Sequence, residues 1–533
     1  MTDPTLIQAL KTAAAYPHPA EEIKLIETHI SWVFLTGEYA YKIKKPLNLG
    51  FLDFSTLEKR KYNCERELLL NRRLVPDIYI DVVPIGGVAE HPRFNATPAI
   101  EYTVKMRQFS PQDQLDALLA RGELQREHMD ELADTIAKFH QSIETAALDS
   151  HWGEPAQLWQ AVAENFSQIR SLIDDTQDLN TLEQWSKSEF KRLEPFFIQR
   201  KKAGFVRNCH GDMHLANIAL IDDRIAIFDC IEFNDAFRWI DVISEIAFTL
   251  MDLTDRNKAD FAARLLDRYL QQTGDYQGLT LLPFYLVYRA MVRAKVAVIR
   301  GQQPGISAKE KTQAEKDYHD YTVLAQRFTQ KRQPVLFITH GLSGSGKTTL
   351  SQPLLERFNL IRLRSDVERK RLFGFSAEEK TGSETEMGIY HSDASKRTYQ
   401  HLLKTASLLC QNGFSVVVDA TFLKRAQRRL FHQLANQLKT PFVILHFHAD
   451  EPLLRQWIRA RAEINKDASE ATLDVLNWQI KTAEAAAENE ADYIVSIDSA
   501  SDEASKTLIS TVQLIFDKQF VASPQQRQQN EKK

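Results

Sequence analysis

A glycine-rich segment in the second half of this 533-residue chain has the residue types and spacing of a phosphate-binding loop. It reads Gly341-Leu-Ser-Gly-Ser-Gly346-Lys347-Thr348, which fits the pattern GxxxxGK[ST], and it lies between a predicted strand and a predicted helix. Glycines let the backbone wrap around phosphates, helix N-terminal amides face the anion, the lysine reaches the terminal phosphates, and the threonine hydroxyl can bind Mg²⁺. The sequence therefore predicts an ATP-Mg²⁺ site whose nucleotide ligands are Gly341, Ser343, Gly344, Ser345, Gly346, Lys347, Thr348 and Thr349, with Thr348 also a metal ligand.

Two aspartates follow predicted strands downstream of this loop. Asp419 ends the apolar strand Val416–Asp419, where a carboxylate can hold Mg²⁺ or its water shell, or can cap the next helix. Asp366 follows the predicted strand Ile361–Leu363, at the carboxyl edge of a parallel sheet. There it could accept the proton of a substrate hydroxyl, or cap the helix that begins beside it.

A second set of residues lies about 130 positions earlier, in His210-Gly-Asp212-Met-His214-Leu-Ala-Asn217. The strand that ends at Asp229 follows across an Asp222-Asp223 turn. This order is that of a kinase catalytic loop, in which an aspartate accepts the proton of the attacking hydroxyl. An asparagine five residues later and a carboxylate on the next strand hold the metal. The sequence predicts Asp212 as the base and Asn217 and Asp229 as Mg²⁺ ligands, with both histidines as structural groups of the loop.

The pattern HGDxHxxN, with the later aspartate, resembles the aminoglycoside phosphotransferase and choline kinase superfamily over about residues 20–300. The run Phe228-Asp-Cys-Ile-Glu-Phe233, with Asp241 downstream, resembles a bacterial branch in which such a domain is fused to a P-loop domain. The resemblance implies a strand lysine on the ATP phosphates and a helix glutamate that holds it. Lys42 and Glu67 are favoured for these roles, and Lys44 and Glu65 are the alternatives left open.

The region from about residue 335 to residue 500 resembles the P-loop kinase family that includes polynucleotide kinase, gluconate kinase and zeta-type toxins, with an AAA-type ATP-binding fold. In that family a strand-ending Asp-x-Thr, here Asp419-Ala420-Thr421, follows the loop. The resemblance implies that Asp366 is the base of this site. It also implies that Arg459 or Arg461 belongs to a lid that covers the transferring phosphate.

The elements that must position these residues form two different patterns. A hairpin over Val33–Lys45 and strands over Ile78–Ile85 and Ile100–Met106 come first, followed by mainly helical sequence. This order predicts an α+β, bilobal, protein-kinase-like fold. Strands and helices alternate after residue 334, which predicts an α/β P-loop domain with a parallel sheet. The predicted domains are 1–300 (kinase-like), 301–333 (a helical, polar connector), 334–520 (P-loop) and 521–533 (a disordered tail).

Bulk composition excludes several classes of protein. The sequence is 43% hydrophobic and 26% charged, with a net charge of −4, which argues against wholesale disorder and gives no general attraction to nucleic acid. Its four cysteines are scattered, and no apolar run is long enough for a membrane helix. We expect a cytoplasmic protein with no membrane partner; the oligomeric state is left open.

Together these patterns predict a bifunctional ATP-dependent phosphotransferase that acts on hydroxyl groups of small-molecule or nucleotide-like acceptors, at two separate ATP-Mg²⁺ sites. One alternative is an ATP-binding switch protein in which the first domain is only a kinase-like scaffold. Another is an aminoglycoside-modifying resistance enzyme. The second alternative needs an acidic surface for a polycationic substrate, for which the sequence offers Glu232, Asp235, Asp241 and Glu245.

Overall fold

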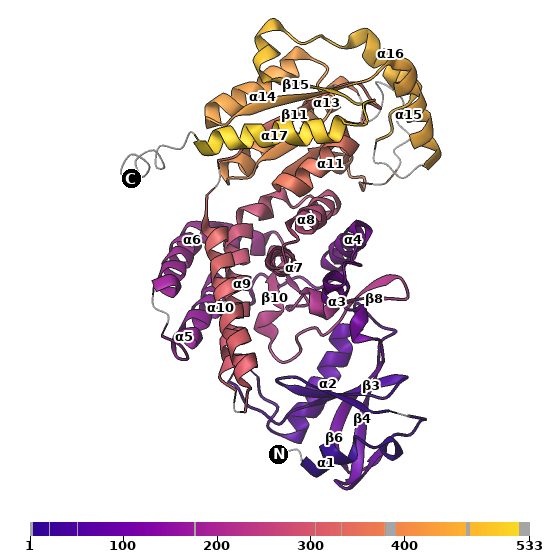
Figure 1. Cartoon of the computed structure of the whole chain (residues 1–533), viewed down its shortest axis with the longest axis vertical. Coiled ribbons are helices and arrows are strands. Elements are labelled where there is room, and N and C mark those ends of the chain that lie inside the picture. The colour runs from indigo at the N-terminus through magenta and orange to yellow at the C-terminus, as the bar shows by residue number, and fades with distance from the viewer. Residues whose placement is uncertain are drawn as a thin grey trace. The chain divides into compact units, whose positions relative to one another are not determined.

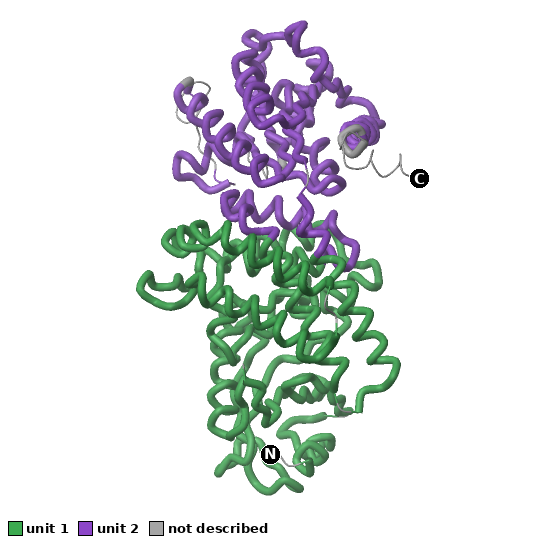
Figure 2. Tube along the Cα trace, turned by 90° about the vertical axis from the view of Figure 1, so that its left-hand side faces the viewer, with its two compact units in different colours: residues 1–252, 284–325 green, residues 253–283, 326–533 purple. Residues whose placement is uncertain are grey.

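The computed structural model describes the chain except for residues 1–3, 21, 51, 175–176, 304, 332, 378, 380–390, 465–468 and 522–533. The described residues form two compact units (Figure 2), one made of residues 1–252 and 284–325 and the other of residues 253–283 and 326–533. This division and the predicted domain boundaries differ, because residues 253–283 fold with the second unit; the boundaries remain a prediction. The predicted disordered tail lies outside the described residues, except for Val521.

The first unit opens with an antiparallel six-stranded sheet in the order β1-β2-β3-β6-β4-β5 (Figure 1). Its strands are Lys24–Glu27 (β1), Ser31–Leu35 (β2), Tyr39–Lys44 (β3), Tyr79–Val88 (β4), His91–Phe94 (β5) and Ala99–Arg107 (β6). Gly37, with φ of 100°, turns β2 into β3 as the sequence predicted. Helix α2 (Leu57–Asn71) packs on β4 and β6, and the Thr56 side chain caps it by accepting the Lys59 amide. Helix α2, which carries Glu65 and Glu67, therefore lies against the sheet that carries Lys42 and Lys44.

The rest of the first unit is mainly helical, with two short two-stranded antiparallel sheets. One pairs β7 (Val206–Asn208) with β10 (Trp239–Asp241), and the other is the hairpin of β8 (Ile218–Ile221) and β9 (Arg224–Ile227), which lies between β7 and β10 in the chain. The described helices of four or more residues in this unit, besides α2, are α1 (Pro4–Ala9), α3 (Leu115–Ala120), α4 (Arg126–Ser142), α5 (Pro155–Arg170), α6 (Gln177–Lys202), α7 (Val242–Asp255), α9 (Leu282–Gly301) and α10 (Ala308–Thr329). The predicted catalytic loop is the segment that connects β7 to β8.

The second unit contains a parallel sheet in the order β12-β13-β11-β14-β15. Its strands are Leu336–His340 (β11), Ile361–Arg364 (β12), Val416–Asp419 (β13), Phe442–His448 (β14) and Ile494–Asp498 (β15). Its described helices are α8 (Ala259–Thr273), α11 (Lys347–Phe358), α12 (Ser365–Leu372), α13 (Ser392–Gln411), α14 (Arg425–Leu438), α15 (Glu451–Ile464), α16 (Leu473–Thr482) and α17 (Ala504–Val521). The antiparallel lobe with its helices and this parallel sheet confirm the predicted fold classes.

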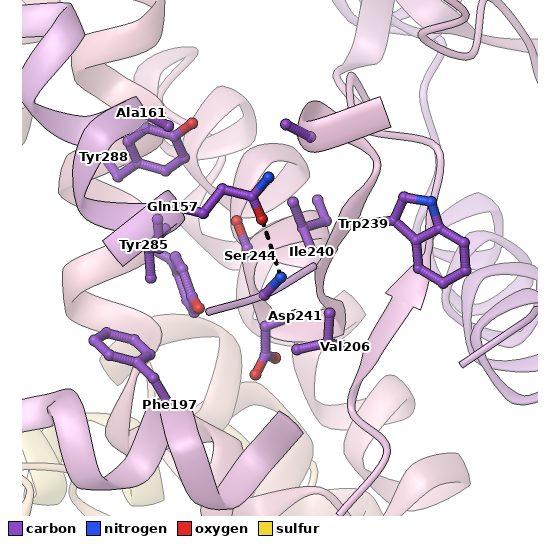
Figure 3. A pocket seen from close by; sticks show the side chains of 13 residues that line it. Gln157, Ala161, Phe197, Val206, Trp239, Ile240, Asp241, Ser244, Tyr285 and Tyr288 are labelled. Carbon is purple, nitrogen blue, oxygen red and sulfur yellow. Dashed lines mark hydrogen bonds between the residues drawn. The ribbon is translucent and has the colours of Figure 1, made fainter. Parts of the chain in front are cut away.

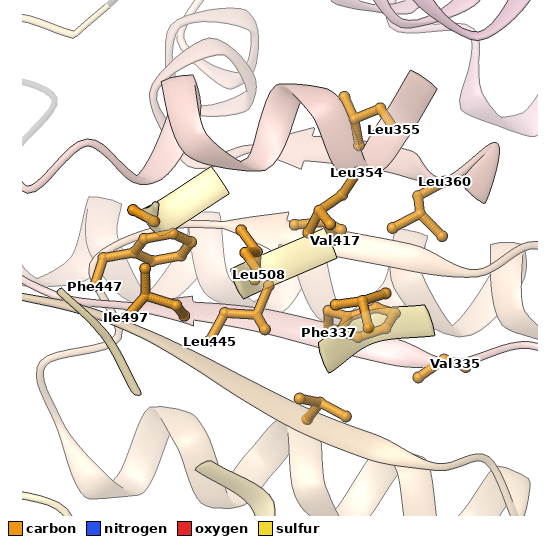
Figure 4. Packing of buried hydrophobic residues seen from close by; sticks show 13 residues of the cluster. Val335, Phe337, Leu354, Leu355, Leu360, Val417, Leu445, Phe447, Ile497 and Leu508 are labelled. Carbon is orange, nitrogen blue, oxygen red and sulfur yellow. The ribbon is translucent and has the colours of Figure 1, made fainter. Parts of the chain in front are cut away.

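Continuous apolar strands explain why helices cover both faces of the parallel sheet. Val416, Val417 and Val418 are all fully buried, as expected of a central strand that has no solvent-facing side. On one face, Phe337 and Val417 pack against α11 and α17 (Figure 4). On the other face lie α13 and α14, which contact β13 and β11. This sandwich holds the carboxyl ends of the strands, and the loops that follow them, in fixed positions.

Helix α8 and the short 3-10 helix Tyr276–Thr280 pack against the P-loop side of the second unit, on α11, β12 and α13. Arg362 of β12 forms a buried ion pair of 2.6 Å with Asp267 of α8, and both side chains are at most 5% exposed. The Tyr276 hydroxyl donates to the Arg362 carbonyl at 3.3 Å. Residues 253–283 are therefore part of the structure that supports the glycine-rich loop.

No helix among the described residues is long and apolar enough to cross a membrane.

Candidate active sites

Helix α7 holds the catalytic loop of the first unit in place. The Glu245 carboxylate accepts the backbone amides of His210 and Gly211, with shortest distances of 2.8 and 2.6 Å. Gly211 has φ of 93°, and a Cβ there would lie 2.7 Å from the Phe237 carbonyl oxygen, so the close turn requires glycine. Farther along α7, Thr249 donates to the Met213 carbonyl and Asp252 accepts the Leu215 amide. The loop is thus fixed by hydrogen bonds over its whole length.

Asp212 lies in this loop with its carboxylate ionised. Burial raises the pKa of Asp212, but His214, whose Nε2 is 3.5 Å from the carboxylate, lowers it together with Arg293 and His210 by more, so the pKa falls well below its usual 3.8. Asn217 donates its side-chain amide to the Asp212 carbonyl at 2.9 Å and to the carboxylate at 3.1 Å. Because the amide nitrogen faces Asp212, the side-chain oxygen is the end of Asn217 that a cation could bind. An ionised aspartate of this kind can accept a proton from a hydroxyl group.

Both candidate lysines contact Glu67. Lys42 lies 2.8 Å from one Glu67 oxygen and Lys44 lies 2.6 Å from the other. Glu65 instead pairs with Lys61 at 3.7 Å and is about half exposed. Burial raises the pKa of Glu67, but the two lysines lower it more, to about 2, so the carboxylate stays charged. The structure therefore brings Lys42 and Glu67 together and leaves Glu65 outside the group, but it adds Lys44 to the pair.

The same two lysines reach the segment that follows β9. Lys42 also pairs with Asp229, and Lys44 with Glu232. Burial lowers the pKa of Lys42, but Asp229 and Glu67 raise it more, and the net pKa lies well above 10.5. Two cations and three carboxylates form one network, in which Lys44 and Glu232 are nearly inaccessible while Asp229 is 42% exposed. Asp229 is thus the member of the network that can exchange its lysine for a metal ion.

The glycine-rich loop of the second unit folds around the ammonium group of Lys347. Lys347 Nζ donates to the carbonyls of Gly341 and Leu342, at 3.0 and 2.7 Å. A Cβ on Gly341 would clash with the Phe447 carbonyl oxygen, and one on Gly344 would lie 2.9 Å from the Ile458 side chain. Burial lowers the pKa of Lys347 from 10.5 to about 8, although Asp419 and Asp366 oppose this shift. Among the described residues no carboxylate forms an ion pair with Lys347, so its ammonium group is available to a phosphate.

Thr348 and Asp419 meet at the predicted metal site. The Thr348 hydroxyl donates to the Asp419 carboxylate at 2.7 Å. A hydroxyl and a carboxylate are the oxygen ligands that Mg²⁺ prefers, so the donor set fits the predicted ion. Asp366 lies in the first turn of α12, whose N-cap residue is Arg364. Its charge raises the pKa of Lys347, so the structure brings Asp366 near the loop and does not use it as the helix cap.

The two predicted lid arginines differ in their surroundings. Arg461 donates to the Ala471 carbonyl at 3.0 Å, and its charge is one of those that lower the pKa of Lys347. Arg459 is exposed on α15. Arg461 is therefore the arginine that the structure associates with the loop.

Of the remaining predicted ligands, Ser345 lies 3.5 Å from Lys347 Nζ, Gly346 is the N-cap of α11, and Thr349 follows Thr348 in the first turn of α11.

Sequence reasoning missed two groups that hold the glycine-rich loop. Gln479 of α16 accepts the Ser343 amide at 2.7 Å and donates to the Ser343 hydroxyl at 2.9 Å. Arg362 donates to the Thr348 carbonyl at 3.2 Å and to Asp267. Gln479 lies 136 positions from Ser343, and neither Gln479 nor Arg362 belongs to a motif, so no local signal identifies them.

Glu245 was also missed, because the sequence suggested only an acidic surface. In the structure Glu245, Asp241 and Glu232 are buried and paired within the protein, with His140, Arg200 and Lys44. His140, Cys209 and Glu245 have ligand atoms within 4.8 Å of one another. Since Glu245 already accepts backbone amides of the catalytic loop, this cluster serves to hold the loop. Asp235 is the member of the suggested surface that stays about 40% exposed, paired with Arg66.

Comparison with known proteins supports this two-part organisation. Residues 107–282 match the phosphotransferase enzyme family and residues 336–486 match a family described as AAA domain. The chain thus has one segment similar to each family, which confirms the two resemblances predicted from the sequence.

Among curated proteins, relatives from Mycobacterium tuberculosis (strain ATCC 25618 / H37Rv) and Mycobacterium bovis (strain ATCC BAA-935 / AF2122/97) carry the name uncharacterized protein. Each is 29% identical over 466 residues, which is 86% of this chain and 90% of the relative.

Several solved structures are similar to parts of the chain. A gluconokinase from Sinorhizobium meliloti 1021 is 18% identical and covers 36% of this chain and 99% of its own, with a TM-score of 0.27. The amicoumacin kinase hAmiN is 14% identical, with 60% and 93% covered and a TM-score of 0.40. A choline/ethanolamine kinase family protein from Mesorhizobium loti is 12% identical, with 61% and 98% covered and a TM-score of 0.39.

Proposed function

We propose that this chain is a bifunctional ATP-dependent phosphotransferase with a complete ATP-Mg²⁺ site in each of its two units. The observation that carries the proposal is that each unit contains a buried lysine, an aspartate assigned as a base, and oxygen groups of the kind that bind a metal ion. The first set is Lys42, Glu67, Asp212, Asn217 and Asp229, and the second is Lys347, Thr348, Asp366 and Asp419. The two family matches support the kinase-type chemistry of both sets.

At the first site, Asp212 accepts the proton of an acceptor hydroxyl as the terminal phosphate of ATP is attacked. The low pKa of Asp212 keeps it ionised, and the Asn217 and Glu245 contacts fix its loop. Lys42, oriented by Glu67, holds the ATP phosphates. The Asn217 oxygen and Asp229 fit a divalent ion, which when bound neutralises charge on the phosphates. Asp229 leaves Lys42 when nucleotide and metal bind, because phosphate oxygens then take its place.

At the second site, the loop amides and Lys347 hold the nucleotide phosphates, and Asp366 accepts the proton of the acceptor hydroxyl. Thr348 and Asp419 fit the metal ion. Arg461, or Arg459, covers the transferring phosphate, and its positive charge stabilises the charge that develops there. The acceptor of this site is a small molecule or a nucleotide-like compound with a free hydroxyl group.

The structure offers no support for an aminoglycoside-modifying enzyme. Three of the four acidic residues suggested for a polycation surface, Glu232, Asp241 and Glu245, are buried and paired with other side chains of the protein. We therefore propose a small-molecule acceptor for the first site that does not need to be a polycation.

Equilibrium binding of a non-hydrolysable ATP analogue with Mg²⁺ tests the proposal. Calorimetry on the full chain should report two nucleotides per chain, and Lys347→Ala and Asp229→Ala should each remove one of them. Lys506→Ala, at a lysine with a 77% exposed side chain, and Asp223→Asn, at an exposed turn, are matched controls that should keep both. One nucleotide per chain, lost in either variant, would mean a single shared site and would refute the two-site proposal.

The acceptor is identified separately. A metabolite extract incubated with the protein, ATP and Mg²⁺ should contain, by mass spectrometry, at least one compound that has gained a phosphate. That product should disappear with Asp212→Asn or with Lys347→Ala, according to the site that forms it.

A further inference from the structure

A pocket opens in the helical part of the first unit (Figure 3). Its walls come from α5, α6, α9, the start of α7 and the two-stranded sheet of β7 and β10. The space inside is about 560 Å³, a figure that includes the open solvent at its mouth. Asp212, Asn217 and Asp229 do not line it. The pocket is therefore distinct from the three residues assigned to catalysis and metal binding at the first site.

The walls of this pocket are aromatic and carry no net charge. Phe197, Trp239, Tyr285 and Tyr288 form much of its surface. The carboxylate in the wall, Asp241, is neutralised by two hydrogen bonds from the Arg200 guanidinium, at 2.5 and 2.9 Å. Burial raises the pKa of Tyr285 and of Tyr288, so both phenols are neutral. A charged ligand would find no counter-charge here, whereas a flat, neutral one could stack on the rings.

Two polar side chains in the lining of this pocket, Ser244 and Gln157, can each form a further hydrogen bond. The Ser244 hydroxyl is buried, in a residue that is 1% exposed, and has no hydrogen-bond partner among the described residues. A buried hydroxyl without a partner is costly, which makes it a strong attractor for a ligand group. Beside it in Figure 3, the Gln157 carboxamide oxygen accepts the Gly153 amide at 3.2 Å, so the nitrogen end of Gln157 is the end left to donate.

We propose that this pocket is a binding site for an uncharged small molecule with a ring and at least one hydroxyl or carbonyl group. The ring packs between the tyrosines of α9 and the hydrophobic side chains of β10, and the polar group bonds to Ser244 and Gln157. The site is built on the elements that hold the catalytic loop, because Ser244 precedes Glu245 in α7 and β7 leads directly into the loop. A ligand in this pocket contacts α7 and β7, which hold the loop that carries Asp212, and does not need to contact Asp212 itself.

Binding of phenol, the simplest molecule with this chemistry, tests the proposal on the full chain by ligand-observed saturation-transfer NMR. Wild-type protein should bind phenol, and benzoate and benzylammonium should bind at least about tenfold more weakly because the pocket cannot neutralise their charge. Ser244→Ala should weaken phenol binding by roughly 2- to 12-fold, as expected for one lost hydrogen bond. Ala161→Leu should abolish binding by filling the space, and Ala163→Leu, on the same helix but outside the lining, should not.

Four results would overturn the proposal: no phenol binding to wild type at about 10 mM, phenol binding that Ala161→Leu leaves unchanged, phenol binding that Ser244→Ala leaves unchanged, or equal binding of the charged analogues. A melting curve for each variant shows whether it is folded, and Ser244→Ala tests the site even if Ala161→Leu does not fold. Nucleotide stoichiometry is measured without phenol, so this proposal and the two-site proposal can fail independently.

Discussion

Raising the pH from about 7.5 to about 9.5 should weaken nucleotide binding at the second site and leave the first site almost unchanged. The reason is the environment of the two lysines. Lys347 is 9% exposed and donates to uncharged oxygens, and burial lowers its pKa from 10.5 to about 8. Lys42 contacts two carboxylates, which keep its pKa well above 10.5. Lys347 therefore loses its proton in this pH range and Lys42 does not.

The size of the effect follows from linkage. Phosphate binding favours the charged lysine, so the pKa of Lys347 rises in the complex and a proton is taken up when nucleotide binds to the neutral form. Affinity is then constant below the pKa of the free protein and falls as pH rises through it, about tenfold per pH unit. With a pKa of about 8, the loss between pH 7.5 and 9.5 is about 25-fold, or roughly 2 kcal/mol.

Calorimetry with a non-hydrolysable ATP analogue and Mg²⁺ measures this dependence at each site separately. The Asp229→Ala variant reports the second site, and Lys347→Ala reports the first. Lys347→Arg is the matched control, because a guanidinium cannot lose its proton in this range, and its second site should show no such fall. The reasoning is refuted if second-site affinity is flat across this range in wild type, or if both sites weaken equally.

Three further outcomes are expected. Asp212→Asn should lower turnover of an identified first-site acceptor by roughly 10²–10⁴ and leave ATP affinity nearly intact, because only the proton acceptor is lost; unchanged turnover would contradict the catalytic-loop assignment. Asp267→Ala should destabilise the second unit by about 3–5 kcal/mol in calorimetric melting, since it leaves the buried Arg362 charge without its carboxylate, whereas Lys506→Ala, at the exposed pair with Glu503, should cost about 1 kcal/mol or less; equal costs would count against the buried pair. Glu245→Ala should lower first-site turnover without changing second-site nucleotide affinity, because two loop amides lose their acceptor; wild-type turnover would mean that the loop is held by its other contacts.

The sequence by itself determined the two fold classes and the main members of both candidate sites. The glycine-rich loop and the catalytic loop are local patterns, because each depends on residues within about ten positions whose backbone geometry and chemistry act together. Strand boundaries in the second unit were also predictable, since buried parallel strands such as Val416–Asp419 appear as continuous apolar runs. In these cases the local sequence and the final fold require the same residues.

Only the tertiary structure decided which distant residues support those sites. Lys42 and Lys44 lie on one face of β3, so alternation could not separate them, and both prove to contact Glu67. Glu245, Gln479 and Asp267 act through side-chain hydrogen bonds or ion pairs to segments 34, 136 and 95 positions away. Such contacts depend on how the helices pack, and a single buried carboxylate or amide has no sequence signature, because the same residue types are common on exposed helix faces.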